Sequence, residues 1–312
     1  MNYVVRDPFG SVAQPLFRST GVNGIYGRTA LFERVVDGLS GLISRYRAHN
    51  AEVLRFPPVI NRAHIEKAGY LHSFPHLLGA VSCLHGDEAE IRAAVDRPSN
   101  EGGWTAALKA TDLVLTPAAC YHVYPLVAAR GRVPAGGVVF DVACDCFRHE
   151  PSQHVDRLQS FRMREYVCLA SPRQAADFRD RWMQQGQEIA DQLDLRHAIA
   201  PASDPFFGRA AKLMADNQIE QALKFELLIA VRSTQEPTAC MSFNCHRDHF
   251  GTKWDLRGEA GEVTHSACAA FGMDRLALAL FAAHGTDIET WPAPVRAALS
   301  IDRSDRPAAP GR

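Results

Sequence analysis

Two stretches decide the fold: GGVVFDVACDCFRHE (residues 136–150) and SFRMREYVCLA (residues 160–170). Both are rich in β-branched and aromatic residues, and the polar run PSQHVDRLQ separates them, so the sequence predicts two strands joined by a long loop. Because side chains alternate along a strand, Arg148 and Glu150 are expected to face the same side. A guanidinium in that position can bind a carboxylate or a phosphate through two parallel hydrogen bonds.

Three more strand candidates follow toward the C-terminus. They are FELLIAV (225–231), TACMSFNC (238–245) and VTHSACAAF (263–271). Strands that come in succession, rather than alternating with helices, favour an antiparallel sheet with helices packed against it. We therefore expect an α+β fold, in which an antiparallel β-sheet is flanked by helices.

Two segments predict long helices. In residues 28–48 the apolar side chains recur at helical spacing, and the helix is followed by RFPPVI (55–60), whose two prolines interrupt regular structure. A second helix is expected to begin after Ser171 as N-cap, with Pro172 in the first helical position. Because a turn-rich stretch follows it, we interpret residues 171–209 as a helical insertion.

These elements define one domain over residues 28–300. Residues 1–27 are rich in Gly, Pro and Ser and predict an irregular lead-in, and residues 301–312 predict a disordered tail. The chain has 312 residues, 46% of them hydrophobic, which is enough for one large core.

Composition argues against several classes of protein. The net charge is −1, from 34 basic and 35 acidic residues, so the basic excess typical of nucleic-acid binding is missing. The N-terminus does not resemble a signal peptide, and no run of about 18 apolar residues could span a bilayer. Eight cysteines in a chain of this size favour buried thiols or a metal site over disulfides, so we expect a cytoplasmic protein.

A strand-to-helix junction near the C-terminus can bind an anion. The stretch CAAFGMDRLALAL (268–280) turns at Gly272 into an apolar helix that carries Arg275 at its start. Glycine permits close approach of the backbone, and a helix N-terminus favours anionic ligands. Taken alone, the same pattern also fits an ordinary strand-to-helix junction that binds no ligand.

Taken together and in this order, the stretches resemble the catalytic domain of class II aminoacyl-tRNA synthetases over roughly residues 28–300. The predicted hairpin, with Phe147-Arg148-His149-Glu150, Arg157, Phe161, Arg164 and Glu165, is similar to the second signature motif of that family. The 268–280 stretch is similar to the third motif. The helix 28–48 with RFPPVI is similar to the first motif, which forms the dimer interface in that family, so the resemblance implies a homodimer.

The resemblance also implies where ATP and its magnesium would bind. Arg148 would contact the α-phosphate, Arg157 and Arg275 the outer phosphates, and Glu150 would lie near the adenine. Glu236 would help to hold magnesium. The remaining residues implied to line the nucleotide are Leu158, Ala239, Cys240, Met241 and Ser242.

The sequence departs from the third motif at Cys268 and Ala270, which stand where that motif has glycines. With this departure the chain is more similar to the archaeal-type seryl-tRNA synthetases, which bind zinc through two cysteines and a glutamate. The matching positions here are Cys120, Glu165 and Cys268, which implies one zinc per chain. Three protein ligands and one open position are typical of a zinc that binds substrate, so Cys120 and Glu165 are also predicted substrate-binding residues.

Other metal-binding sets remain open. Cys144 and Cys146 share a strand face, and Cys240, Cys245 and His246 cluster in a later strand. No C-x-x-C spacing occurs, so the usual pattern of a structural zinc site is absent.

A catalytic core without room for a tRNA-binding arm resembles the amino acid:[carrier protein] ligases. That resemblance implies an enzyme that activates glycine or alanine with ATP and passes it to the phosphopantetheine thiol of a carrier protein. Docking of the carrier is expected on the arginine-bearing helix in residues 171–209, and tRNA is an unlikely partner. Three alternatives remain: a seryl-type tRNA-charging enzyme with a separate tRNA-binding subunit, a synthetase paralogue with another acceptor, and a non-catalytic paralogue.

Overall fold

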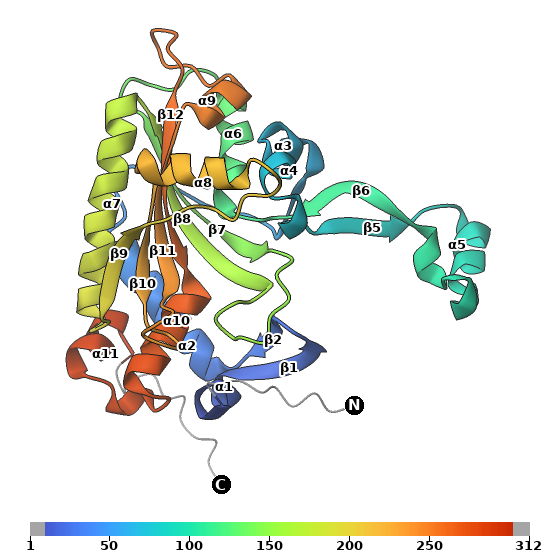
Figure 1. Cartoon of the computed structure of the whole chain (residues 1–312), viewed down its shortest axis with the longest axis horizontal. Helices are drawn as coiled ribbons and strands as arrows, with labels where there is room; N and C mark the ends of the chain where they lie inside the picture. Colours follow the sequence, from blue (N-terminus) through green and yellow to red (C-terminus); the bar gives the residue numbers. More distant parts are fainter. Residues whose placement is uncertain (1–9, 302–312) are drawn as a thin grey trace.

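A seven-stranded sheet forms the centre of the molecule in the computed structural model, which describes residues 10–301 (Figure 1). All neighbouring strands are antiparallel, except that β3 runs parallel to β7 at one edge. The predicted α+β fold is therefore confirmed, as is the hairpin of the two stretches that decide it. In spatial order the strands are β3 (Glu52–Arg55), β7 (Val138–Phe147), β8 (Ser160–Ala170), β12 (His265–Gly272), β11 (Thr238–Arg247), β10 (Lys224–Ile229) and β9 (His197–Pro201).

Four helices cover one face of the sheet, called the back face here. They are α2 (Ala30–Arg45), α7 (Pro172–Gln192), α10 (Met273–His284) and α11 (Ala293–Leu299). Their apolar side chains form the larger core, in which Trp182 of α7 stacks on Tyr166 of β8 with ring centroids 4.1 Å apart. As predicted, Ser171 caps α7, and a reciprocal hydrogen-bond pair with Gln174 completes the cap.

The opposite face, called the front face, is only partly covered. Two helices, α6 (Val123–Arg130) and α9 (His249–Trp254), pack on it in a second core with the β7 side chains Phe140 and Val142. A third helix, α8 (Ala211–Glu220), crosses in front of the sheet (Figure 1) and has no buried residue. No helix within residues 10–301 is long and apolar enough to cross a membrane.

The structure differs from two predicted boundaries. Residues 10–27 are not an irregular lead-in, because they belong to α1 (Gly10–Leu16) and to a hairpin of β1 (Phe17–Val22) and β2 (Ile25–Arg28). Segment 171–209 contains the predicted long helix as α7, which covers the sheet, and then supplies the edge strand β9. Ile301 is 4% exposed, so the packed domain extends past residue 300; residues 1–9 and 302–312 lie outside the described residues.

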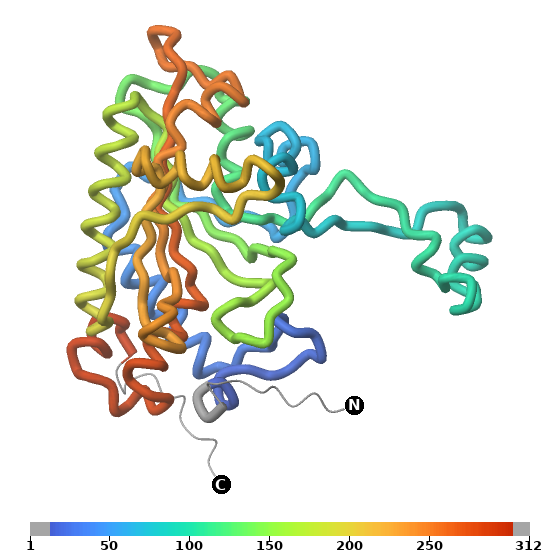
Figure 2. Tube along the Cα trace, viewed as in Figure 1, coloured from blue at the N-terminus to red at the C-terminus, as the bar shows by residue number. Residues whose placement is uncertain are grey.

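The strand predictions missed an arm that projects away from the body of the molecule (Figure 2). It is built on a three-stranded sheet of β4 (Val59–Asn61), β6 (Leu108–Leu115) and β5 (Ala80–Leu84). Helix α5 (Glu88–Val95) lies at the tip, and two short helices, α3 (Arg62–Lys67) and α4 (Tyr70–Ser73), lie at the base.

A buried ion pair fixes the register of the central hairpin. Arg164 of β8 donates to both carboxylate oxygens of Asp141 of β7, at 2.9 and 2.6 Å, and both side chains are almost fully buried. Arg164 also donates to Ser40 and Ser44 of α2, so the pair ties the hairpin to the back-face helix. Burial opposes ionisation of Asp141, but the hydrogen bonds and charge of Arg164 and its neighbours outweigh it and hold the pKa of this carboxyl below its usual value.

Replacement of Asp141 by Asn should therefore destabilise the protein strongly. It leaves the buried Arg164 without its counter-ion, a change that typically costs about 3–5 kcal/mol. The matched control is Arg92→Ala, which breaks an exposed pair with Glu88 and should cost about 1 kcal/mol or less. Urea unfolding of the two variants measures the difference, and equal stabilities would contradict the assigned role of the pair.

Candidate active site

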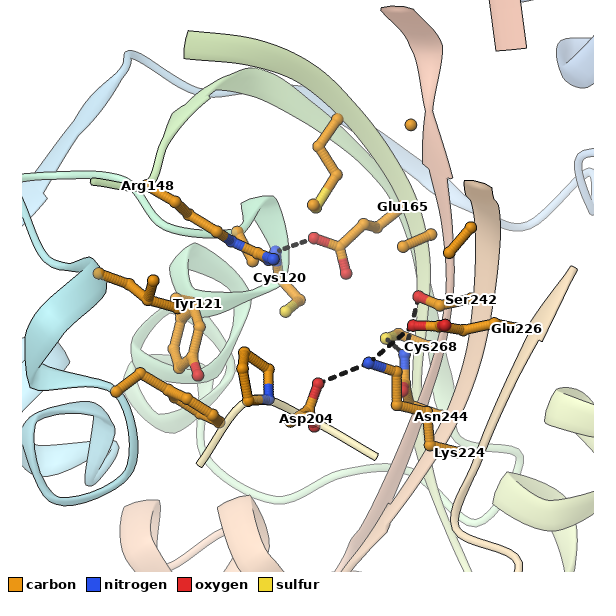
Figure 3. Close-up of a pocket in the computed structure, with 18 of the residues that line it drawn as sticks. Cys120, Tyr121, Arg148, Glu165, Asp204, Lys224, Glu226, Ser242, Asn244 and Cys268 are labelled. Atoms are coloured by element: carbon orange, nitrogen blue, oxygen red, sulfur yellow. Dashed lines mark hydrogen bonds and ion pairs between the residues drawn. The ribbon is translucent and has the colours of Figure 1, made fainter. Parts of the chain in front are cut away.

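A cavity of about 530 Å³ lies on the front face of the sheet, between α8 and the base of the arm. This volume is in the range typical of small-molecule sites, about 300–1,000 Å³. Its floor is made by side chains of β8, β12, β11 and β10, and its walls by the segments before β7 and after β9 (Figure 3).

Strand register sets the order of side chains across the floor. Glu226 of β10 lies opposite Ser242 of β11, which lies opposite Ala270 of β12, which lies opposite Glu165 of β8. The row therefore places one carboxylate at each side of a floor built from two small side chains. Small residues at the centre leave room above the sheet for a ligand.

The three predicted metal ligands meet in the cavity. Glu165 accepts a hydrogen bond of 3.0 Å from the backbone N–H of Cys120 (Figure 3). The Cys120 and Cys268 thiols are near enough that Cys268, ahead of burial, raises the pKa of Cys120 well above its usual value. Cys120 lies in a short 3-10 turn, Ala119–His122, directly before α6. Within residues 10–301, no three His, Cys, Asp or Glu side chains are arranged as a preformed metal-binding group.

The chemistry of these three groups nevertheless fits a bound cation. Burial, followed by the charge of Cys268, raises the pKa of Glu165 to about 8. A hydrogen bond from Cys120 outweighs burial and lowers the pKa of Cys268 well below its usual value. In the described chain no basic side chain forms an ion pair with Glu165, so two sulfurs and a carboxylate share a dry site without a counter-ion.

The cavity also contains two cationic side chains, Arg148 and Arg275. Arg275 donates to the backbone oxygens of Asp156 and Ala239, at 2.8 and 3.0 Å, and Arg148 donates to the oxygen of Pro117 at 3.1 Å. Neither arginine has a carboxylate partner in the described part of the chain. Of the predicted nucleotide residues, those that line the cavity are Arg148, Glu150, Leu158, Ala239, Cys240, Met241, Ser242 and Arg275.

Two predicted residues do not line the cavity. Arg157 is largely exposed and lies 3.6 Å from Glu150, and Glu236 is exposed in the loop before β11. Within residues 10–301 the competing metal sets do not form a metal-binding group. The sulfurs of Cys144 and Cys146 lie 3.5 Å apart, but neither residue lines the cavity. In the other set, His246 lies beside Cys268.

The sequence prediction missed a network on the α8 side of the cavity. The Lys224 ammonium is 2.6 Å from Asp204 and 3.0 Å from Glu226, and Gln218 of α8 exchanges two hydrogen bonds with Asp204. Lys224 and Glu226 alternate along β10, which indicates a shared face, but no sequence signal places Asp204 beside them. The network attaches the loop after β9 and α8 to the sheet.

Comparisons with known proteins identify relatives of the chain. No family model matches the chain. The chain is 57% identical, over 95% of its own length and 91% of the relative, to amino acid–[acyl-carrier-protein] ligase 1 of Bradyrhizobium diazoefficiens. It is 27% identical to the type-2 serine–tRNA ligase of Methanopyrus kandleri, over 85% of this chain and 54% of that one.

Among solved structures, M. kandleri SerRS in complex with A. aeolicus tRNASec aligns with a TM-score of 0.80 at 20% identity, covering all of this chain and 63% of that one. The fold is that of a class II aminoacyl-tRNA synthetase catalytic domain. At the identity and coverage found in the B. diazoefficiens ligase, the chain belongs to the amino acid–[acyl-carrier-protein] ligases and is an enzyme.

The raised pKa of Glu165 predicts a pH dependence in metal-free protein. Below its ordinary value of 4.5 the carboxyl is protonated whether the chain is folded or unfolded, so it has no effect. Between 4.5 and about 8 only the unfolded state ionises, so the folded state loses stability as pH rises.

The variant Glu165→Gln lacks this loss. In the presence of a chelator it should therefore gain stability relative to the wild type between pH 5 and pH 8, as measured by urea unfolding. Parallel pH profiles for the two proteins would contradict the assigned pKa.

Proposed function

We propose that this enzyme uses ATP to activate glycine or alanine as an aminoacyl-adenylate and then transfers it to the phosphopantetheine thiol of a carrier protein. One observation supports this most: a single cavity holds both two arginines without carboxylate partners and the Cys120, Glu165 and Cys268 group. Triphosphate and amino acid need these opposite environments within reach of each other. The names of the 57% and 56% identical relatives support the acceptor.

In the first step an oxygen of the amino-acid carboxylate attacks the α-phosphorus of ATP. A new P–O bond forms, the bond to the β-phosphate oxygen breaks, and pyrophosphate leaves. Arg148 would stabilise charge on the α-phosphate, Arg275 would hold the outer phosphates, and Glu150 would lie near the adenine. Arg157 and Glu236 lie outside the cavity lining, so they would have to turn inward on ATP binding to hold the outer phosphates and the magnesium. Fixed charges and positioning supply most of the rate enhancement in such a transfer.

Cys120, Glu165 and Cys268 would hold one zinc per chain. When bound, zinc supplies a Lewis-acidic position for the α-amine of the substrate. Tyr121 and Met163 also line the cavity. The choice of glycine or alanine as substrate rests on the resemblance to the amino acid:[carrier protein] ligases.

The arginines are tested by amino-acid-dependent exchange of labelled pyrophosphate into ATP. Arg148→Ala and Arg275→Ala should each lower the exchange rate by about 100-fold or more, the usual scale for loss of a charge-stabilising group. Arg173→Ala is the matched control, because this arginine is 92% exposed on the back-face helix α7. If exchange in the two cavity variants equals that of the control, ATP binds elsewhere.

In the second step the carrier thiol attacks the carbonyl carbon of the adenylate, and AMP leaves. The carrier was expected to dock on α7, but α7 packs on the back face of the sheet, away from the cavity. Arg179 of that helix is occupied by the backbone oxygen of Ala222 and the ring of Phe225. Of the expected segment, only Asp204, Pro205 and Phe206 border the cavity, next to α8.

Docking beside α8 is therefore the better proposal. This helix borders the cavity through Met214, Asn217 and Gln218, and its outer surface is not covered by the described chain. The exposed Arg209 and Lys212 at its start would attract an acidic carrier.

The acceptor is tested by offering both candidates, bulk tRNA and phosphopantetheinylated carrier proteins, with labelled amino acid. Label should appear on the carrier. The double variant Arg209→Glu, Lys212→Glu should slow transfer and weaken its salt dependence without changing pyrophosphate exchange, whereas Arg173→Glu should change neither. Label on tRNA alone would instead favour the tRNA-charging alternative. The 27% identity to a type-2 serine–tRNA ligase is the reason to test that alternative.

Assembly and location complete the proposal. The α2 helix and the Pro57-Pro58 turn correspond to the dimer-forming motif of class II synthetases, which supports a homodimer with two-fold symmetry. We also propose a cytoplasmic location, which the eight free thiols support.

A further inference from the structure

The sulfur of Cys268 has two nitrogen neighbours on the adjacent strand. Asn244 Nδ2 lies 3.3 Å from Sγ, and His246 Nε2 lies 3.7 Å from it. Asn244 is directly opposite Cys268 in the pairing of β11 with β12. An amide nitrogen can only donate, so the sulfur is the acceptor of the Asn244 hydrogen bond. Cys268 is 3% exposed, so protein groups rather than bulk water surround the sulfur.

The imidazole of His246 is held in one orientation. Its Nδ1 lies 3.1 Å from the hydroxyl of Ser266, which is 1% exposed, and its ring meets Phe250 edge-on at 5.0 Å. If the Ser266 hydroxyl donates to Nδ1, the ring proton is on Nε2 and points at the sulfur. If Cys268 is a thiolate, this is the tautomer that satisfies all three groups, because an anionic sulfur can only accept a hydrogen bond.

Cys120 is in a different environment. Its backbone N–H donates to Glu165, and its thiol lies against Cys268. No side-chain nitrogen within residues 10–301 donates to its sulfur. The two cysteines are therefore not equivalent, and only one has donors arranged around it.

We propose that Asn244 and His246 are positioning residues that hold the Cys268 sulfur as a metal-binding thiolate. This inference rests on the zinc site of the proposed function. Hydrogen bonds from N–H groups offset the charge of a buried anionic sulfur and direct its remaining lone pairs toward the metal. Groups that support a ligand in this way typically change metal affinity about 10–100-fold.

Cobalt binding tests this role without a catalytic assay. The full-length protein is stripped with a chelator and titrated with Co²⁺, and the sulfur-to-cobalt charge-transfer absorption is followed. His246→Ala and Asn244→Leu should each weaken Co²⁺ binding about 10–100-fold and shift the absorption, because the sulfur loses an N–H donor. Ser266→Ala should act in the same direction but less strongly, since it only releases the tautomer.

Matched variants separate positioning from a general structural effect. His249→Ala is the control, because His249 bonds to the backbone oxygen of Ala68 rather than to the sulfur. His246→Gln retains an N–H donor of similar reach and should restore much of the affinity. Thermal unfolding of the metal-free proteins shows whether each variant folds. If Asn244→Leu does not fold, His246→Gln, His249→Ala and Ser266→Ala still test the proposal.

The outcomes distinguish this inference from the proposed function. If Cys268→Ser loses the metal while His246→Ala and Asn244→Leu bind Co²⁺ like the wild type, the inference is wrong and the metal site stands. A loss in His246→Ala as complete as in Cys268→Ser would make His246 a ligand and overturn its positioning role. If the wild type binds neither Co²⁺ nor Zn²⁺, the metal site itself is wrong.

Discussion

Alternation of side chains along β8 is the constraint on which the rest of the structure depends. Arg164 and Glu165 are neighbours in sequence, yet they serve opposite faces of the sheet. Arg164 joins Asp141 and helix α2 on the back face, and Glu165 joins the two thiols in the cavity. A slip of one residue would exchange the two faces, and would place a carboxylate in the apolar core and a guanidinium among the sulfurs. The buried ion pair with Asp141 opposes such a slip.

The cavity contains charges whose counter-ions the described chain does not supply. Arg148 and Arg275 are held by backbone carbonyl groups rather than by carboxylates. Such groups are costly for a folded protein, because buried charges are stable only when they are paired. By contrast, Asp141 has three arginines around it. On the back face Asp141 is surrounded by arginines, whereas on the front face the cavity arginines lack carboxylate partners. Charged groups left unpaired in a cavity are typical of a ligand-binding site.

Local patterns predicted the parts of the fold that local physics determines. The strand periods of β7, β8, β11 and β12 and the Ser171 cap of α7 appear in the sequence because the chain itself specifies them. The arm was missed because its strands are largely exposed and lack a strong apolar alternation. In the site, Cys120, Glu165 and Cys268 were found through resemblance, since 148 positions separate the outer two and no spacing rule links them. Asp204 was beyond prediction, because only the tertiary fold brings its loop to Lys224.

Strand β11 contributes residues to the cavity along most of its length. Ala239, which accepts a hydrogen bond from Arg275, and Asn244, which donates one to Cys268, lie five residues apart on this strand. An odd separation would place two side chains on opposite faces of a regular strand, but the pairing with β10 shifts at Cys240, between the two residues. The extra residue therefore lets positions on both sides of the shift face the cavity. An insertion or deletion in β11 would have to keep this irregularity, or one end of the cavity floor would turn into the apolar core.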